Sequence, residues 1–182
     1  MNIKLNYYDL ETLHASIAND YAAVSILIFD KKEIVYIKRS NEMPTHKGQI
    51  AFPGGKREEE DIDIVSTAVR ESTEELLLSE STIKPFGYLN SIDTVEYKFD
   101  VYPIVCQLLE KPKNFNVSEV QEIFFVEIKK LSNPNNWSYR GTYPDDWIFM
   151  IGKEILWGAT AKITRRLLNL DLRQTIRFVF YC

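Results

Sequence analysis

The sequence predicts one α/β or α+β domain with a central mixed sheet. Three observations support this fold class. β-prone runs are interleaved with two or three helical segments. Hydrophobic residues make up 45% of the 182 residues, enough to bury a core. The chain has no internal repeats and no Gly/Ser-rich linkers, so residues 1–182 are expected to form a single domain.

The first half of the chain predicts a hairpin followed by a helix. Residues 9–19 have weak helical periodicity. "AAVSILIFD" and "EIVYIKR" are rich in β-branched residues and are separated by the polar turn Asp30-Lys31-Lys32, which is typical of a hairpin. A loop begins at Ser40 and ends in "FPGG", and helical periodicity then runs from Ile62 to Leu77.

The second half predicts further strands and a C-terminal helix. "KPFGYLNSIDTVEYKFDVYPIVCQLLE" has the composition of two strands, and "VQEIFFVEI" that of another. "SYRGTYPDDWIFMI" is aromatic, β-prone and rich in turn residues. "WGATAKITRRLLNL" has the periodicity of an amphipathic helix.

The bulk composition narrows the partners and the compartment. A net charge of −4 and a pI near 5.3 give no reason to expect nucleic-acid binding. Only Cys106 and Cys182 are present, so a disulfide framework is not expected. The N-terminus lacks a signal-peptide pattern, and no apolar run approaches the roughly 20 residues that cross a bilayer. We expect a cytoplasmic protein without membrane partners, and the sequence is compatible with a homodimer.

The predicted helix carries an unusual group of acids. Its apolar residues form one stripe that is expected to face the core: Ile62, Val65, Val69 and Leu76. Glu71, Glu74 and Glu75 fall on roughly the opposite side, where like charges one turn apart oppose helix formation. A hard cation such as Mg²⁺ or Mn²⁺ would reverse that penalty. Arg70 can reach Glu74 across one turn.

Each feature has an ordinary explanation when it is taken alone. Three acids on a helix can form a solvated face, and a Gly-Gly pair can form a simple loop. Gly54-Gly55 also lets the backbone approach a ligand or metal closely. The combination of a glycine turn, a helix entry and the Arg-Glu and Glu-Glu pairs is far more specific. Lys56, Arg57 and the "EEED" run are expected to form the solvated part of the loop.

The residues from Arg70 to Leu78, "RESTEELLL", resemble the second half of the Nudix box, Arg-Glu-apolar-any-Glu-Glu-any-Gly-apolar. The first half runs from Gly55 through Asp61 to Arg70 and is one residue longer than the common version. This longer spacing and the upstream "VYIKRSNEMPTHKGQIAFPGG" resemble the coenzyme A pyrophosphatase branch of the Nudix hydrolase family. The similarity extends over about residues 22–170 and implies the fold of that family, an α/β/α sandwich with a central mixed sheet.

Three positions depart from the family pattern. Pro44 stands where the upstream motif has Arg, which removes a phosphate contact. Leu77 replaces the glycine of the box and Ser72 replaces an apolar residue. We expect the last two to alter helix packing or termination rather than metal binding.

The resemblance implies roles for several residues. It implies that Glu71, Glu74 and Glu75 carry catalysis and, with the Gly54 carbonyl, hold Mg²⁺ or Mn²⁺. Arg70 is expected to support a glutamate. The general base is one of the helix glutamates or Glu119, for which an exposed loop acid is the alternative.

Substrate binding is expected to involve three further residues: Arg39, His46 and Gly55. Arg39 can bind phosphate or adenosine, or form a structural ion pair. His46 can contact phosphate or be a solvated loop residue. Base stacking by Tyr143, Trp147 or Phe149 is an alternative to core packing of these rings.

The activity implied is hydrolysis of a nucleoside diphosphate-linked small molecule by attack of water on one phosphorus. The first hypothesis is a metal-dependent diphosphatase that cleaves coenzyme A or its derivatives to 3',5'-ADP and phosphopantetheine. Hydrolysis of ADP-ribose or of a nucleoside diphosphate sugar is the alternative, which Pro44 keeps open. A non-catalytic nucleotide-binding module is a third reading.

Overall fold

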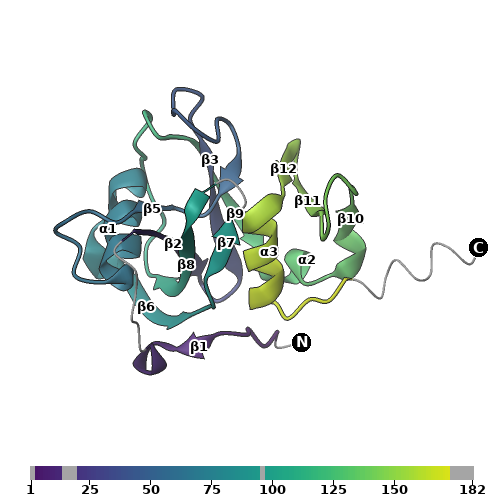
Figure 1. Ribbon diagram of the computed structural model, residues 1–182, viewed down its shortest axis with the longest axis horizontal. Helices are drawn as coiled ribbons and strands as arrows, with labels where there is room; N and C mark the ends of the chain where they lie inside the picture. The colour runs from purple at the N-terminus through teal and green to yellow at the C-terminus, as the bar shows by residue number, and fades with distance from the viewer. Residues whose placement is uncertain (1–2, 14–19, 95–96, 173–182) are drawn as a thin grey trace, which may run out of the picture.

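The computed structural model describes residues 3–13, 20–94 and 97–172. A central mixed sheet carries helix α1 (Ile64–Leu76) on one face and helix α3 (Gly158–Leu167) on the other (Figure 1). The α/β class with a mixed sheet is confirmed. The first expected helix is reduced to the 3₁₀ turn Leu10–Thr12, while its residues 14–19 lie outside the described ranges, as does Cys182.

Within the described ranges the central sheet contains nine strands, in chain order: β1 (Tyr8–Asp9), β2 (Tyr21–Phe29), β3 (Glu33–Arg39), β4 (Ile50–Ala51), β5 (Gly54–Lys56), β6 (Ile83–Tyr88), β7 (Ile92–Thr94), β8 (Tyr97–Leu108) and β9 (Val120–Glu127). The strand order is β1-β6-β8-β2-β3-β4, with β5, β7 and β9 paired to β2, β8 and β3. Strands β2 and β8 are parallel along their whole paired length, and the other pairs are antiparallel. The predicted hairpin is therefore present as β2–β3.

The glycine segment fills a fork between β2 and β3. These two strands pair only at their hairpin end, where Ile28 and Phe29 face Ile34 and Glu33. At the other end, Ala22–Val24 of β2 pairs with β5 instead. This separation of β2 from β3 gives the Gly54-Gly55 backbone a place in the sheet directly beside α1.

Strand alternation divides the apolar side chains into two clusters. On β3, Ile34 and Tyr36 face α3, whereas Val35 and Ile37 face α1. Arg39, two residues beyond Ile37, therefore belongs to the α1 face. This parity places its guanidinium on the side of the sheet that carries the acids.

The expected core stripe of α1 is wrong in part. Ile62 is 91% exposed because the helix begins at Ile64, after an N-terminal capping box in which Asp63 and Ser66 exchange hydrogen bonds. The residues that α1 buries are Ile64, Thr67, Ala68, Ser72, Glu75 and Leu76, and Val65 and Val69 are only partly buried. The helix packs on β2 through small residues, since the Ser25 hydroxyl donates to Ala68 O at 2.8 Å. Small side chains allow this close approach, but they do not stand out as hydrophobic positions in the sequence pattern.

The helix ends at Leu77, where the family pattern has glycine. Leu77 adopts a left-handed conformation (φ 49°, ψ 47°), and its N–H bonds to Thr73 O. This is the conformation that glycine adopts most readily at a helix C-terminus. The departure from the family glycine therefore affects helix termination through the backbone conformation of Leu77 itself.

A second, three-stranded sheet packs beside α3 (Figure 1). It contains β10 (Trp137–Tyr139), β11 (Trp147–Ile151) and β12 (Glu154–Leu156). It follows the short helix α2 (Ile128–Leu131) and the 3₁₀ turn Pro134–Asn136, and another 3₁₀ turn, Glu80–Thr82, precedes β6. The β-prone segment at 138–151 is thus two strands joined by a loop, and β12 is too short to have been predicted.

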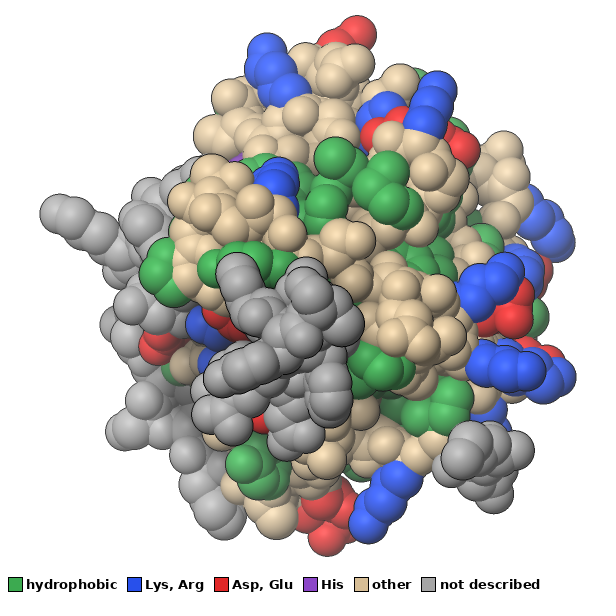
Figure 2. Space-filling model, turned by 90° about the vertical axis from the view of Figure 1, so that its right-hand side faces the viewer, with side chains coloured by type: hydrophobic (Ala, Val, Ile, Leu, Met, Phe, Trp, Pro, Cys, Tyr) green, Lys and Arg blue, Asp and Glu red, His purple; other side chains and the backbone are tan. Residues whose placement is uncertain are grey.

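The face of the molecule beside the second sheet carries a mixture of hydrophobic and charged side chains. Figure 2 shows hydrophobic side chains in separate groups there, and Lys and Arg side chains at several places around the outline, most of them on the right together with Asp and Glu side chains. Among the described residues, no helix is both long and apolar enough to span a membrane.

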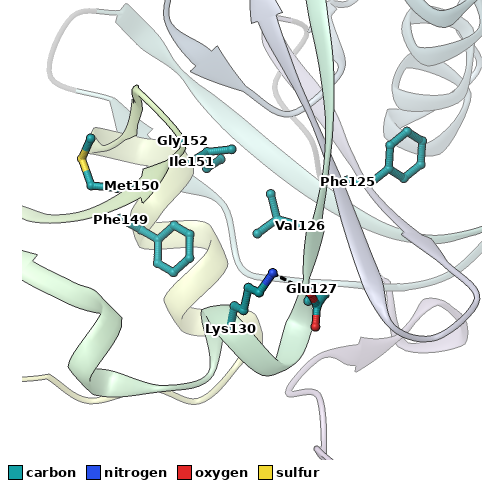
Figure 3. A pocket seen from close by; sticks show the side chains of 8 residues that line it. All are labelled: Phe125, Val126, Glu127, Lys130, Phe149, Met150, Ile151 and Gly152. Atoms are coloured by element: carbon teal, nitrogen blue, oxygen red, sulfur yellow. Dashed lines mark ion pairs between the residues drawn. The ribbon is translucent and has the colours of Figure 1, made fainter.

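A cavity of about 180 Å³ opens between β9 and β11 (Figure 3). Its walls include Val126, Lys130 and Phe149. Val126 lies six residues along β9 from Val120, which pairs with Arg39, so about 20 Å of strand separates the two ends. The cavity is therefore not part of the acidic site.

Candidate active site

The three helix glutamates occupy three different environments. Glu75 is 1% exposed, and its Oε2 accepts a hydrogen bond from the Gly54 N–H at 3.0 Å. Glu71 is partly buried, with Oε1 3.1 Å from Arg70 Nη2. Glu74 is the most exposed, and its Oε2 lies 2.9 Å from Arg70 Nη1. The predicted contact between Arg70 and Glu74 is therefore present.

The expectation that all three acids lie opposite the core is wrong. Glu75 belongs to the buried face of α1, next to Leu76, because the fork between β2 and β3 exposes the polar backbone of β5 beneath it. A carboxylate can be buried there because a backbone N–H is available to satisfy it. Only Glu74 has the solvated position expected of a surface acid.

The register of β5 orients the Gly54 backbone toward the acids. Ser25 N–H donates to Pro53 O at 2.8 Å, and Arg57 N–H donates to Tyr21 O at 3.1 Å. Bonded and non-bonded pairs alternate along an antiparallel ladder, so the intervening Val24–Gly54 pair is non-bonded. Both the N–H and the C=O of Gly54 therefore point away from β2, and the N–H reaches Glu75. The carbonyl expected to bind metal faces the same side.

Both glycines lie in close contact with neighbouring atoms. A Cβ on Gly54, whose φ is +151°, would overlap the backbone of Ala23 and Val24. A Cβ on Gly55 would overlap the Glu71 carboxylate. Gly55, expected to bind substrate, thus lies directly against an acid of the box.

Crowding and burial disfavour ionisation of the inner acids. Burial, with the nearby charges of Glu71 and Glu119, raises the pKa of Glu75 to about 8, although the Gly54 N–H and Arg39 act in the opposite direction. Burial also raises the pKa of Glu71, with Glu74 and Glu119 adding to the effect against Arg70. A cation placed among these carboxylates would therefore be stabilising.

Asp61 is a site-supporting residue that the sequence did not reveal. It was expected in the solvated "EEED" run, but it is buried. Its carboxylate accepts from Arg70 Nε at 2.9 Å, Arg70 Nη2 at 3.1 Å, Thr67 Oγ1 at 2.9 Å and Glu58 N–H at 2.9 Å. Burial acts to raise the pKa of Asp61, but these hydrogen bonds outweigh it and lower the pKa. The one sequence feature that could have revealed Asp61 was its position six residues after Gly55, in the lengthened first half of the box.

Arg70 is thereby fixed between Asp61 and the helix acids. Its guanidinium also donates to the Lys56 carbonyl at 2.9 Å. These contacts use the Nε, Nη1 and Nη2 donors of the guanidinium. The pKa of Arg70 is raised, with the Asp61 hydrogen bonds as the largest cause. The geometry agrees with the expected supporting role, and it makes Asp61 the principal anchor.

Arg39 points into the acid cluster from β3. Its Nη1 lies 3.8 Å from Glu75 Oε1, and its side chain is 15% exposed. Its buried Nε has no hydrogen-bond partner among the residues that the structure describes. The ion pair with Glu75 is thus present, and the guanidinium retains donor capacity for a ligand.

His46 lies in the turn that leads into β4. It has a positive φ of 54°, and its Nδ1 is 3.2 Å from Gln49 Oε1. This loop is tied to the site end of β3, since Arg39 N–H donates to Gln49 O and Gly48 N–H donates to Arg39 O. Pro44 lies in the same loop and is exposed.

Glu119 approaches the acids from the loop before β9. Asn116 N–H donates to the Glu75 carbonyl at 2.9 Å, and Asn116 Nδ2 donates to Glu119 Oε1 at 3.0 Å. Ser40 N–H donates to Glu119 O at 2.8 Å, which ties the loop to the end of β3. The structure therefore brings Glu119 close enough for its charge to affect both Glu71 and Glu75.

The donor set has the chemistry of a hard divalent cation site: carboxylate oxygens and the outward-facing Gly54 carbonyl. Across the described ranges, however, no group of three His, Cys, Asp or Glu side chains is arranged to hold a metal ion directly. Glu71 and Glu74 are paired with Arg70, and Glu119 with Asn116. The expected ligands fit the cation chemically but are not preassembled, so rotation of these side chains would be needed.

Comparison with known proteins is consistent with this geometry. Residues 20–146 match the model of one protein family, described as the NUDIX domain. A protein of Yersinia enterocolitica named "Uncharacterized Nudix hydrolase NudL" is 30% identical over 158 residues, which are 81% of this chain and 79% of the relative. The protein of Mus musculus named "Mitochondrial coenzyme A diphosphatase NUDT8" is 31% identical over 151 residues, 75% and 70% of the two chains.

Solved structures with the same fold are more distant in sequence. The structure of DR0079 from Deinococcus radiodurans superposes with a TM-score of 0.56 at 16% identity and covers 87% of this chain and 89% of that one. A MutT/nudix family protein from Enterococcus faecalis gives a TM-score of 0.52 at 15% identity, covering 86% and 63%. These likenesses show the fold alone.

Proposed function

Because this chain belongs to the Nudix hydrolase family, we propose that it is a metal-dependent pyrophosphohydrolase that cleaves coenzyme A or its derivatives to 3',5'-ADP and phosphopantetheine. The observation that carries the proposal is the convergence of Glu71, Glu75 and Glu119 beside the Gly54 carbonyl. The coenzyme A diphosphatase name of the Mus musculus relative supports the substrate class.

The chain's own residues would bind and align the diphosphate. When bound by Gly54, Glu71, Glu74 and Glu75, Mg²⁺ or Mn²⁺ would neutralise the diphosphate and lower the pKa of the attacking water. Arg70, held by Asp61, would keep Glu71 and Glu74 oriented. Arg39 would donate from its unpartnered side to a phosphate oxygen, and His46 would approach the diphosphate from the β4 loop.

Glu119 is the favoured general base. Among the residues that the structure describes, Glu119 has no arginine partner, unlike the helix glutamates, and its Oε1 accepts a hydrogen bond from the neutral Asn116 amide. It would accept the proton of the attacking water, which a positioned carboxylate can do with a rate contribution of about 10²–10⁴-fold. Glu119→Gln should then lower kcat within that range and leave KM within about twofold. Glu122→Gln, at an exposed acid three residues further along, on β9, is the matched control.

The alternative substrate is ADP-ribose or a nucleoside diphosphate sugar. The same acids would serve either reaction, and Pro44 removes a cation from the loop that carries His46. The distinguishing experiment measures initial rates on coenzyme A, acyl-coenzyme A, ADP-ribose and sugar nucleotides with Mg²⁺ or Mn²⁺. The highest kcat/KM for coenzyme A supports the proposal, and a preference for a sugar nucleotide selects the alternative.

A non-catalytic nucleotide-binding module is the outcome if no substrate is hydrolysed with either metal and Glu75→Gln changes only stability. The single domain over residues 1–182, the cytoplasmic location, the homodimer and the absence of nucleic-acid and membrane partners stay predictions from the sequence.

A further inference from the structure

The loop between β10 and β11, residues 140–146, is exposed but tightly held. The side chain of Asp146 is fully buried and accepts hydrogen bonds from Arg140 Nε at 2.9 Å and Arg140 Nη2 at 3.0 Å. The same carboxylate accepts from Thr142 N–H at 2.9 Å. A bidentate Arg–Asp pair with a buried acceptor fixes geometry strongly. The loop therefore closes around its own carboxylate.

A second pair fastens this loop to α3. Asp145 has a φ of 63°, and its Oδ2 lies 2.7 Å from Arg165 Nη2. The other arginine nitrogen, Nη1, lies 3.1 Å from Oδ1. Arg165 is nearly buried, so the contact is anchored in the helix rather than in solvent. Two arginine–aspartate pairs thus hold a loop of only seven residues.

The held loop places Tyr143 and Arg140 beside Trp157, which directly precedes α3. The rings of Tyr143 and Trp157 are near-parallel, at 27°, with centroids 6.4 Å apart. The Arg140 Cζ lies 5.0 Å from the Trp157 centroid and 5.6 Å from that of Tyr143. Aromatic faces and the flat guanidinium are the groups on which planar heteroaromatic rings stack.

Core packing does not account for these rings. Trp147 and Phe149, which were considered for stacking from the sequence, are buried between β10, β12 and α3 and are not available to a ligand. Tyr143 lies outside both apolar clusters and is 45% exposed. Of Tyr143, Trp147 and Phe149, the accessible ring is therefore that of Tyr143, which the loop holds in place.

The cluster lies toward the same end of β3 as the acids, but on the face of the sheet that carries α3. Glu154 of β12 pairs with Lys38 at 2.9 Å, and both side chains are largely buried. Lys38 is followed directly by Arg39, whose guanidinium approaches Glu75. Trp157 comes three residues after Glu154, which is at most about 10 Å of extended chain.

We propose that Tyr143, Trp157 and Arg140 form a stacking surface for the nucleobase of the substrate. The surface would bind the base while the diphosphate lies at the acids of α1. It is a specificity-determining surface rather than a catalytic one, and its link to turnover rests on the proposed hydrolase function.

The test measures binding of 3',5'-ADP to the full chain in EDTA by calorimetry, and kcat and KM for coenzyme A with Mn²⁺. Tyr143→Ala should weaken 3',5'-ADP binding about tenfold, since stacking of one base is worth about that much, and should raise KM with kcat within twofold. Tyr143→Phe should retain binding. Tyr139→Ala is the matched control, because Tyr139 is 46% exposed at the base of the same loop.

Three outcomes would overturn this proposal: the wild type fails to bind 3',5'-ADP, Tyr143→Ala binds it as tightly as the wild type, or Tyr139→Ala weakens it equally, which would assign the effect to loop structure. Failure of the proposed function looks different. The wild type would then bind 3',5'-ADP through Tyr143 but hydrolyse none of the nucleoside diphosphate-linked substrates.

Discussion

The Gly54 N–H donates a hydrogen bond to the buried carboxylate of Glu75, with N and Oε2 3.0 Å apart. This bond joins a strand inserted in the fork between β2 and β3 to the last turn of α1. The same backbone segment is closely packed on both sides: a Cβ on Gly54 would overlap the β2 backbone, and a Cβ on Gly55 would meet the end of the Glu71 side chain. The two glycines are thus constrained by different neighbours.

Substituting the two glycines should therefore have separable effects. In Gly54→Ala the Cβ meets the rigid β2 backbone at a φ unfavourable for alanine, so the free energy of unfolding should fall by about 3 kcal/mol. In Gly55→Ala the Cβ meets only the end of the Glu71 side chain. That variant should stay within about 1 kcal/mol of the wild type in urea unfolding and lose at least about tenfold in kcat. Equal losses of stability in both variants would contradict this distinction.

Asp61→Asn should affect both stability and turnover. The substitution leaves Arg70 without its charged anchor, and breaking such a buried pair typically costs about 3 kcal/mol. Glu71 and Glu74, both oriented by Arg70, should then lose their alignment, which lowers kcat. Urea unfolding and initial rates measure the two effects. Glu60→Gln, one residue away and exposed, should change neither; if it does, the effect belongs to the loop's charge and not to Asp61.

The difference between Asp61 and Glu60 also marks the limit of sequence reasoning. In a run of four acids nothing local distinguishes the buried one, because its burial depends on Arg70, nine residues away. The clustering of the box acids one helical turn apart, by contrast, was predictable from helical spacing, and so was the contact between Arg70 and Glu74. Local periodicity determined those contacts without reference to the rest of the fold.

The orientation of α1 could not be predicted for the same physical reason. Its buried face includes Ala68 and Ser72, whose value lies in allowing close packing against β2. Glu75 is buried because β2 and β3 separate and admit β5, a long-range pairing that no residue of the helix encodes. The loop clamped by Asp146 likewise depends on a pairing that forms only once β10 and β11 are aligned.

The stability of the metal-free protein should depend on pH through Glu75. Burial raises its native pKa to about 8, from an ordinary value of 4.5. Between these values the native state holds a proton that the unfolded chain has released, so stability is full below the lower value and is lost as the pH rises through the higher one. Glu75→Gln removes this loss. Its melting temperature in EDTA, relative to the wild type, should increase from pH 5 to pH 9.

A divalent cation should change that comparison. In the proposed metal site Mn²⁺ would bind the ionised Glu75 carboxylate, so at pH 8.5 it should raise the melting temperature of the wild type, by mass action on the native state, and leave that of Glu75→Gln unchanged. If the melting temperatures of the wild type and Glu75→Gln differ by the same amount at every pH in EDTA, Glu75 is not protonated in the native state.

Leu77→Gly should stabilise the protein. Leu77 holds a left-handed conformation that costs a non-glycine residue about 1 kcal/mol or more, and its side chain is largely exposed, so little packing is lost. Glycine avoids that strain but loses more chain entropy on folding, which leaves an expected net gain of about 0.5 kcal/mol. Leu77→Ala keeps the strained backbone and should show no gain. Urea midpoints of the three proteins decide the matter, and equal midpoints for the glycine and alanine variants would show that backbone strain at the end of α1 is not relieved.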